Sequence, residues 1–282
     1  MTEILVPVLV LGATGVLAAL LLSWVSRRFA VREDPRIAEI EELLPGANCG
    51  GCGYSGCHAF AAACASATSL DSMNCPGAGK AAMARIGEIV GLDAGKAEAK
   101  VAVVRCGGTC AARPRTAVYD GPRSCTLLAA TGVGDSACVW GCLGMGDCVA
   151  ACPFGAMAMD PYTGLPLVDD TKCVGCGVCV SACPRGIITL LPKGPRGLRV
   201  WVACGNHDKG AAAIKVCKNA CLGCGKCVKV CGHNAITVTD NLAVIDPSAC
   251  RLCRKCVDTC PTDAIHCANF PTAHNTIKES DS

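Results

Sequence analysis

Three dense cysteine runs constrain most strongly what this 282-residue chain can fold into. Each run has the spacing C-x2-C-x2-C-x3-C, and together they comprise Cys173, Cys176, Cys179 and Cys183; Cys221, Cys224, Cys227 and Cys231; and Cys250, Cys253, Cys256 and Cys260. This spacing places three thiolates around one [4Fe–4S] cluster and gives the fourth to the other cluster of a pair. Zinc sites normally use separated C-x2-C pairs, so the runs favour iron–sulfur clusters over structural zinc.

A loosened fourth run, Cys138-x3-Cys142-x5-Cys148-x3-Cys152, precedes them, so the four runs form two pairs of the bacterial ferredoxin kind. Crossed ligation in the first pair is expected to join Cys138, Cys142, Cys148 and Cys183 at one cluster and Cys152, Cys173, Cys176 and Cys179 at the other. In the second pair it is expected to join Cys221, Cys224, Cys227 and Cys260, and Cys231, Cys250, Cys253 and Cys256. Apolar segments after the runs predict short strands, so each pair is expected to form an α+β ferredoxin-like 2x[4Fe–4S] unit.

A separate cysteine group lies nearer the N-terminus. Cys49, Cys52 and Cys57 are interleaved with glycines that let the backbone fold tightly, and Cys75 follows in a Pro/Gly loop. These four thiols are expected to bind another [4Fe–4S] cluster in a small helical domain. Cys64 is the competing fourth ligand, and a structural zinc site is the alternative for the group taken alone.

These five sets use 20 of the 27 cysteines. Segments 101–105 and 198–203 look like strands that each run into Cys-Gly, and their pairing would bring two further thiols together. A sixth cluster is therefore considered at Cys106, Cys125, Cys204 and Cys217, with unligated thiols as the alternative. Cys64, Cys110 and Cys267 remain outside all six sets, and the odd total excludes complete disulfide pairing.

The first residues predict a transmembrane helix. Ile4 to Val25 contains no charged residue and is long enough to cross a bilayer. Arg27, Arg28 and Arg32 follow it, whereas only Glu3 precedes it, so the positive-inside rule predicts an external N-terminus and a cytoplasmic bulk. A cleaved signal peptide is the alternative, although no basic region precedes the apolar run.

The motifs predict a chain of small units. They are a membrane anchor (1–28), a four-Cys [4Fe–4S] domain (33–92), a connecting segment with possible extra ligands (98–135), a first ferredoxin-like unit (136–192), a basic insert with possible extra ligands (193–219), a second ferredoxin-like unit (220–267) and a polar tail (268–282).

The formal charge is +3, and nine basic residues but one acidic residue lie between Pro184 and Val230. We expect this stretch to attract an acidic electron carrier, unless the anionic clusters themselves consume the charge. Nucleic-acid binding is disfavoured because aromatic residues are scarce and the basic residues lie among the predicted ligands.

The motifs together resemble one family over essentially the whole chain. The apolar start, the segment Gly46-Ala-Asn-Cys-Gly-Gly-Cys-Gly-Tyr-Ser-Gly-Cys57, the segment Gly-Cys142-Leu-Gly-Met-Gly-Asp-Cys148 and the tandem runs resemble RnfB, the B-type component of the Rnf complex. The resemblance implies an ion-translocating ferredoxin:NAD oxidoreductase of the bacterial inner membrane, in which this component takes electrons from soluble ferredoxin on the cytoplasmic side.

The resemblance also implies a direction of transfer. Electrons would pass through the ferredoxin-like units to the Cys49 group and then to membrane subunits, for NAD reduction coupled to Na⁺ or H⁺ translocation. The NAD and flavin sites would belong to other subunits, so no catalytic residue and no stand-alone active site is expected here. A membrane-anchored polyferredoxin that serves a regulator-reducing system or a hydrogenase is the alternative.

Overall fold

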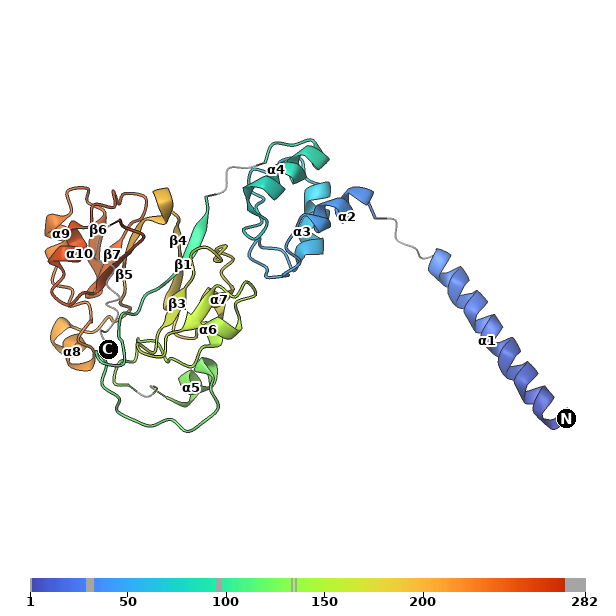
Figure 1. Ribbon diagram of the computed structural model, residues 1–282, viewed down its shortest axis with the longest axis horizontal. Coiled ribbons are helices and arrows are strands. Elements are labelled where there is room, and N and C mark those ends of the chain that lie inside the picture. The colour runs from blue at the N-terminus through green and yellow to red at the C-terminus, as the bar shows by residue number, and fades with distance from the viewer. Residues whose placement is uncertain (1, 29–32, 95–97, 133, 135, 272–282) are drawn as a thin grey trace.

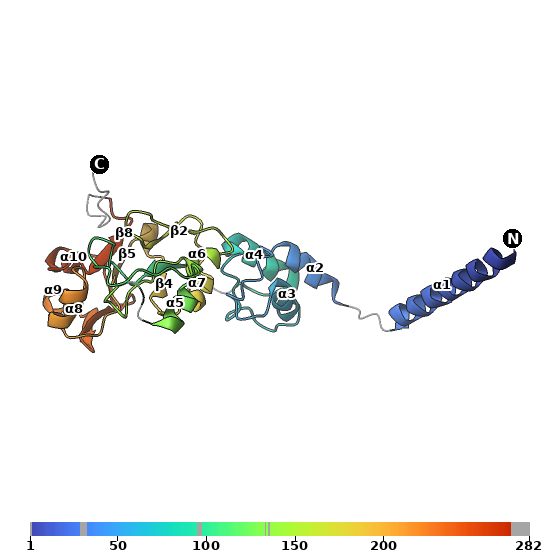
Figure 2. The ribbon, with the colours of Figure 1, turned by 90° about the horizontal axis from the view of Figure 1, so that it is seen from below.

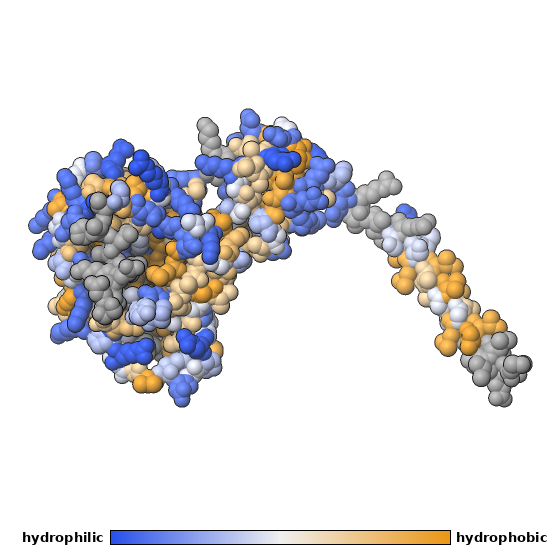
Figure 3. Space-filling view, viewed as in Figure 1, coloured by the Kyte–Doolittle hydropathy of each residue, from blue (hydrophilic) through white to orange (hydrophobic). Residues whose placement is uncertain are grey.

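The computed structural model describes residues 2–28, 33–94, 98–132, 134 and 136–271. Its first element, helix α1 (Thr2–Arg28), stands apart from the rest of the chain (Figure 1). Hydrophobic side chains cover much of the face of this helix that Figure 3 shows. Within it, Val8–Ser26 is long and apolar enough to cross a membrane. The predicted single N-terminal apolar helix is confirmed, whereas Arg32 and the predicted tail beyond residue 271 lie outside the described residues.

A small helical domain follows α1. It comprises α2 (Pro35–Glu42), α3 (Cys57–Ala65) and α4 (Gly79–Val90). Asp34 caps α2, because its Oδ1 accepts a hydrogen bond from the Arg36 N–H at 2.9 Å. Ile40, Phe60 and Ile86 are fully buried between the helices, and the thiols of Cys57 and Cys75 share this core. Because these thiols lie inside the core, a bound centre can replace apolar packing in so small a domain.

The first ferredoxin-like unit is built from two antiparallel strand pairs with short helices. Its elements are β1 (Lys100–Val104), α5 (Cys125–Thr131), α6 (Asp147–Ala150), β2 (Met157–Met159), β3 (Pro166–Val168), α7 (Val178–Ala182) and β4 (Ile188–Pro192). β1 pairs with β4, with Ala102 opposite Leu190, and β2 pairs with β3. The unit therefore begins and ends on neighbouring strands, which closes it around its cysteines.

The second unit repeats this arrangement. Its elements are the 3₁₀ turn η1 (Pro195–Gly197), β5 (Arg199–Val202), α8 (Gly210–Val216), α9 (Lys226–Val230), β6 (Ile236–Thr239), β7 (Leu242–Ile245), α10 (Lys255–Thr259) and β8 (Ile265–Ala268). β5 pairs with β8 and β6 pairs with β7, all antiparallel. The predicted α+β class with tandem ferredoxin-like units is confirmed.

The predicted pairing of segment 101–105 with segment 198–203 is wrong. Each of these strands instead pairs with the last strand of its own unit, because that pairing completes a closed unit. The two strands still approach each other at their ends, where the Gly107 N–H donates to the Ala203 carbonyl at 2.7 Å. The Trp201 indole also donates to the Val104 carbonyl at 3.1 Å, which fastens the second unit to the first.

The parts follow one another along the long axis of the molecule. Figure 2 shows the second unit, the first unit, the helical domain and α1 in that order. Between the two units, Arg199 is buried and makes a two-pronged ion pair with Asp170, with both N···O distances at 2.6 Å. Because the parts are arranged in this order, their cysteine groups are distributed along the long axis of the molecule rather than gathered in one core.

Candidate metal centres

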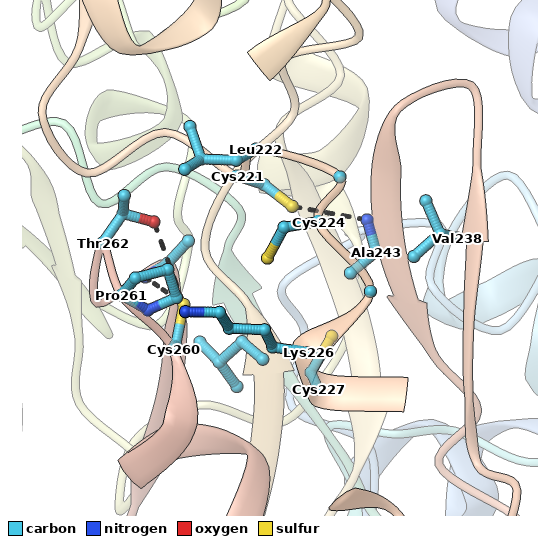
Figure 4. A pocket seen from close by; sticks show the side chains of 14 residues that line it. Cys221, Leu222, Cys224, Lys226, Cys227, Val238, Ala243, Cys260, Pro261 and Thr262 are labelled. Carbon is cyan, nitrogen blue, oxygen red and sulfur yellow. Dashed lines mark hydrogen bonds between the residues drawn. The ribbon is translucent and has the colours of Figure 1, made fainter. Parts of the chain in front are cut away.

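The clearest four-thiol set lies in the second unit and is shown in Figure 4. Cys221, Cys224, Cys227 and Cys260 line one cavity. The N–H of Ala243 donates to the Cys221 sulfur at 3.5 Å, and the N–H of Ala264 donates to the Cys260 sulfur at 3.3 Å. Backbone donors aimed at ligand sulfurs stabilise anionic iron–sulfur centres, so the local fold suits a [4Fe–4S] cluster.

Two more predicted sets come together in the same way. Cys231, Cys250, Cys253 and Cys256 line a cavity in the second unit, and Cys152, Cys173, Cys176 and Cys179 line one in the first. In the latter cavity the Ala156 N–H donates to the Cys152 sulfur at 3.3 Å, and the Ala102 N–H donates to the Cys173 sulfur at 3.5 Å. The structure thus gathers three of the four crossed sets as the spacing predicts.

The remaining sets differ from the sequence prediction by an exchange of two cysteines. One cavity is lined by Cys125, Cys142, Cys148 and Cys183, and another by Cys106, Cys138, Cys204 and Cys217. The prediction placed Cys138 in the first of these sets and Cys125 in the second. The structure therefore groups Cys125 and Cys138 in these two cavities differently from the prediction.

Asp147 explains where Cys125 lies. Its carboxylate accepts hydrogen bonds from the N–H of Cys125 at 2.7 Å and from the N–H of Thr126 at 3.0 Å. Desolvation opposes ionisation, but these backbone donors still hold the pKa of Asp147 below its usual range. Since Asp147 directly precedes Cys148, this contact fastens the start of α5 beside the ferredoxin run. No cysteine spacing encodes that contact.

Cys138 lies in the cavity that Cys106, Cys204 and Cys217 also line. The side-chain amide of Asn206 lies 3.9 Å from the Cys138 sulfur, and Asn206 is only 1% exposed. The Gly141 N–H closes a turn onto the Cys138 carbonyl at 3.3 Å.

The helical domain brings its own thiols together but leaves one choice open. Burial raises the pKa of Cys75, and the neighbouring Cys52 and Cys49 add to the rise, so these three lie close to one another. Cys57 starts α3 in the same core, where its N–H donates to the Asn48 side chain at 2.8 Å. Cys64 also lies near Cys52 and Cys75, so the choice of Cys75 over Cys64 as the fourth ligand stays a prediction.

We number the six thiol sets from the helical domain outward. Site 1 is Cys49, Cys52, Cys57 and Cys75; site 2 is Cys152, Cys173, Cys176 and Cys179; site 3 is Cys125, Cys142, Cys148 and Cys183; site 4 is Cys106, Cys138, Cys204 and Cys217; site 5 is Cys221, Cys224, Cys227 and Cys260; site 6 is Cys231, Cys250, Cys253 and Cys256. Cys110, which is exposed, and Cys64 and Cys267, which are buried, lie outside these sets.

Site 2 lies next to site 1 on one side and next to site 3 on the other. A Cβ added at Gly51 would lie 2.6 Å from the Cys176 carbonyl oxygen, so the cysteine loops of sites 1 and 2 touch through their backbones. Burial raises the pKa of Cys148 to about 12, and its neighbours Cys125, Cys183 and Cys179 contribute. Because Cys179 belongs to site 2, its influence on Cys148 places sites 2 and 3 close together.

The series continues into the second unit. The Cys142 N–H of site 3 donates to the Cys106 sulfur of site 4 at 3.4 Å, and the Cys221 N–H of site 5 donates to the Cys204 sulfur of site 4 at 3.3 Å. Burial raises the pKa of Cys256 in site 6 to about 12, with a smaller contribution from Cys227 in site 5. Site 4 therefore bridges the two ferredoxin-like units.

The thiols of sites 2 to 6 each line one cavity. Zinc holds its sulfurs at about 2.3 Å from the metal, which draws four thiols tightly together. Within the part of the chain that the structure describes, no group of three or more His, Cys, Asp or Glu side chains is close enough to hold a single metal ion.

Family models match both ends of this series. A 4Fe–4S dicluster domain model matches residues 137–187 and 220–264, and a second dicluster model matches residues 172–235. A model described as a putative Fe–S cluster matches residues 44–76. Cys106 and Cys125 lie outside the matched residues, whereas Cys204 and Cys217 lie within the span of the second dicluster model.

Curated relatives match most of the chain. It is 45% identical over 87% of its length to the B component of the Na⁺-translocating ferredoxin:NAD⁺ oxidoreductase complex of Acetobacterium woodii, of which it covers 72%. It is 43% identical over 88% of its length to the B component of the proton-translocating complex of Clostridium ljungdahlii, covering 86% of that protein. A third relative, the B component of an ion-translocating oxidoreductase complex of Methanosarcina acetivorans, is 38% identical over 84% of the chain, which covers 88% of it. The chain therefore belongs to the RnfB family, the B components of the Rnf ferredoxin:NAD⁺ oxidoreductase complexes.

Proposed function

We propose that this chain takes electrons from reduced ferredoxin on the cytoplasmic side and relays them to membrane subunits, for NAD⁺ reduction coupled to Na⁺ or H⁺ translocation. The observation that supports the proposal is a series of five cavities, each lined by four cysteines, together with the separate cysteine group of the helical domain that follows α1. [4Fe–4S] clusters bound by these thiols would supply one-electron redox chemistry. The protein itself contributes their placement, burial and hydrogen bonding.

The membrane-facing end of the proposed relay is site 1. The helical domain follows α1 in the chain, and α1 carries the apolar segment that could anchor it in the lipid. With the N-terminus outside, site 1 would lie on the cytoplasmic side close to the membrane, where partner subunits can accept its electrons. No residue of this chain is assigned a proton-transfer or nucleophilic role.

The ferredoxin-facing end is formed by sites 5 and 6. Cys224 and Cys253 are exposed, so a cluster in either site would lie near the surface of the second unit. Exposed basic side chains surround these thiols: Lys226 and Lys229 on α9, and Arg251 and Lys255 beside Cys253. An acidic ferredoxin would be steered to this face.

The predicted basic stretch divides into two parts. The Lys193 ammonium donates to the carbonyls of Asp170 and Cys173, and the buried Arg199 guanidinium pairs with Asp170, so both serve the inside of the molecule. Lys226 and Lys229 remain exposed at the surface of site 5. We therefore assign ferredoxin docking to this smaller group together with Arg251 and Lys255.

The proposed ligands are the six sets defined above. They include Cys125 in site 3 and Cys138 in site 4, and they give a sixth cluster at Cys106, Cys138, Cys204 and Cys217. Holoprotein with six [4Fe–4S] clusters should contain about 24 iron atoms per chain, whereas five clusters give about 20.

The decisive experiment removes the bridge at site 4. In the intact complex, Cys204→Ser should lower the iron content by about four atoms. Reduced ferredoxin should still reduce sites 5 and 6, while site 1 stays oxidised and NAD⁺ reduction is lost. Cys110→Ser is the matched control, because Cys110 is a cysteine outside every set. NAD⁺ reduction at the unaltered rate in Cys204→Ser would refute a relay through site 4.

Docking has a separate readout. The second-order rate of reduction by ferredoxin should fall as the salt concentration rises, because exposed charges are screened. At low salt, the double variant Arg251→Gln/Lys255→Gln should be reduced by ferredoxin at a lower second-order rate than the unaltered protein. Lys215→Gln, on the exposed surface of α8, is the control and should be reduced at the unaltered rate. A rate that does not respond to salt would contradict electrostatic docking.

A further inference from the structure

Arg113 is a buried guanidinium that has no carboxylate partner within the part of the chain that the structure describes. It is 6% exposed, its Nη1 donates to the Cys142 carbonyl, and its Nε has no hydrogen-bond partner. None of the ion pairs among the described residues includes Arg113. The other arginine buried to this degree, Arg199 at 7%, is paired with Asp170. A buried charge is costly unless something of opposite sign lies nearby.

The surroundings of Arg113 identify its counter-charge. It lines the site 4 cavity, and among the described residues no acidic side chain lines that cavity with it. A Cβ added at Gly141 would lie 3.1 Å from the Arg113 Nη1 and 3.5 Å from the Cys138 sulfur. A Cβ at Gly108 would lie 3.2 Å from the Cys217 sulfur and 3.6 Å from the Arg113 Cδ. Two glycines thus leave room for the guanidinium directly beside site 4 sulfurs.

The contact with Cys142 also holds the guanidinium in place. Because Cys142 is a site 3 thiol and Arg113 lines the site 4 cavity, the Nη1 donor to the Cys142 carbonyl places the charge between site 3 and site 4.

We infer that Arg113 is the resident counter-ion of site 4 and raises the reduction potential of the cluster bound there. The inference rests on the proposed function, because it requires a cluster at site 4. Uptake of one electron, donated by the neighbouring reduced site, converts one ferric equivalent to ferrous and makes the centre more negative by one charge. A fixed cation at short range in a poorly screened interior stabilises that product more than the oxidised form.

This tuning has a consequence for the relay. Site 4 is the link between the two ferredoxin-like units, so every electron that crosses from one unit to the other passes Arg113. A raised potential at this link holds an electron midway, within reach of sites 3 and 5. The second unit can then accept a new electron before the first has reached the membrane end.

The test compares two substitutions in the full-length holoprotein. Arg113→Met removes the charge but keeps a long apolar side chain, whereas Arg113→Lys keeps the charge but loses the planar fork. We measure iron content and follow each cluster by EPR during a redox titration. At an applied potential equal to the site 4 midpoint of the unaltered protein, the ratio of reduced to oxidised site 4 in Arg113→Met should be at least tenfold lower than in the unaltered protein. A tenfold change in this ratio corresponds to a midpoint lowered by about 59 mV for one electron.

The controls separate charge from structure. Arg113→Lys should keep the site 4 midpoint near its unaltered value, and Lys215→Met, which removes an exposed cation on α8, should leave it unchanged. Loss of the site 4 cluster in Arg113→Met but not in Arg113→Lys would also support a counter-ion. An unshifted site 4 midpoint in Arg113→Met would overturn the inference. An equal shift of the midpoint, or an equal loss of the site 4 cluster, in Arg113→Lys and Arg113→Met would also overturn it.

Failure of the proposed function has a different signature. If Cys204→Ser and the unaltered chain contain the same amount of iron, site 4 holds no cluster, and the relay and this inference both fall. If Cys204→Ser loses about four iron atoms while Arg113→Met titrates normally, the relay stands and only the role of Arg113 is overturned.

Discussion

Gly51 controls how closely the helical domain approaches the first ferredoxin-like unit. A Cβ at this position would lie 2.6 Å from the Cys176 carbonyl oxygen and 2.9 Å from the Cys176 Cα and Cβ. The loop that carries Cys176 cannot retreat easily, because a Cβ at Gly175 would lie 2.5 Å from the Lys100 carbonyl oxygen on β1. In Gly51→Ala the helical domain must therefore move away from the loop that carries Cys176, while that loop stays in place.

The size of the displacement follows from these distances. Ordinary van der Waals contacts of a Cβ begin at 3.4 Å, so the two loops must separate by about 0.8 Å to relieve the 2.6 Å approach. Gly51 itself does not need a left-handed backbone, so the substitution adds no backbone strain of its own. The separation lengthens the path from site 2 to site 1 and leaves every proposed ligand in place.

The assay is electron transfer in the intact complex. We expect Gly51→Ala to keep its iron content and cluster midpoints, while the rate at which site 1 is reduced after site 2 falls several-fold, because tunnelling decays exponentially with distance. Gly51→Val should be slower still. Gly232→Ala is the matched control, since Gly232 also lies beside a cysteine but has no atom within 4 Å of its added Cβ. Reduction of site 1 at the unaltered rate in Gly51→Ala would refute transfer through this contact.

Three further outcomes are expected. Burial raises the pKa of Cys64 to about 11, so its thiol stays protonated at pH 8. Iodoacetamide should therefore label Cys64 far more slowly than the exposed Cys110, and the labelling rate of Cys64 should increase only as the pH approaches 11. Similar labelling rates of the two thiols at pH 8 would contradict the burial of Cys64. Phe60→Ala should lower the free energy of unfolding of the helical domain by about 3–5 kcal/mol, because Phe60 is fully buried, and hydrogen exchange of the α3 amides in the full chain would measure it. Asp170→Asn should destabilise the contact between the two units by about 3 kcal/mol, because it leaves the buried Arg199 guanidinium unpaired, and an unaltered temperature of thermal cluster loss would contradict this.

Much of this protein is determined by local sequence. The C-x2-C-x2-C spacing of 173–179, 221–227 and 250–256 holds three thiols on one tight loop, so each run predicts three members of a set without reference to the rest of the chain. The fourth thiol of sites 2, 5 and 6 was also predictable, because the ferredoxin pairing of runs is a repeated unit. The uncharged segment from Ile4 to Val25 predicted α1 for the same reason, since apolar length is a local property.

The tertiary structure decided what depends on contacts between distant segments. The Asp147 carboxylate draws the start of α5 to site 3, and Asn206 holds Cys138 at site 4, so the two cysteines exchange the places that spacing assigned to them. Strands β1 and β5 pair inside their own units, yet their ends still bring Cys106 and Cys204 to one cavity. The burial of Arg113 beside site 4 has no signature in its neighbours along the chain. Spacing fixes thiols that share a loop, whereas the bridging site is assembled from four separate segments and exists only once both units have folded and docked.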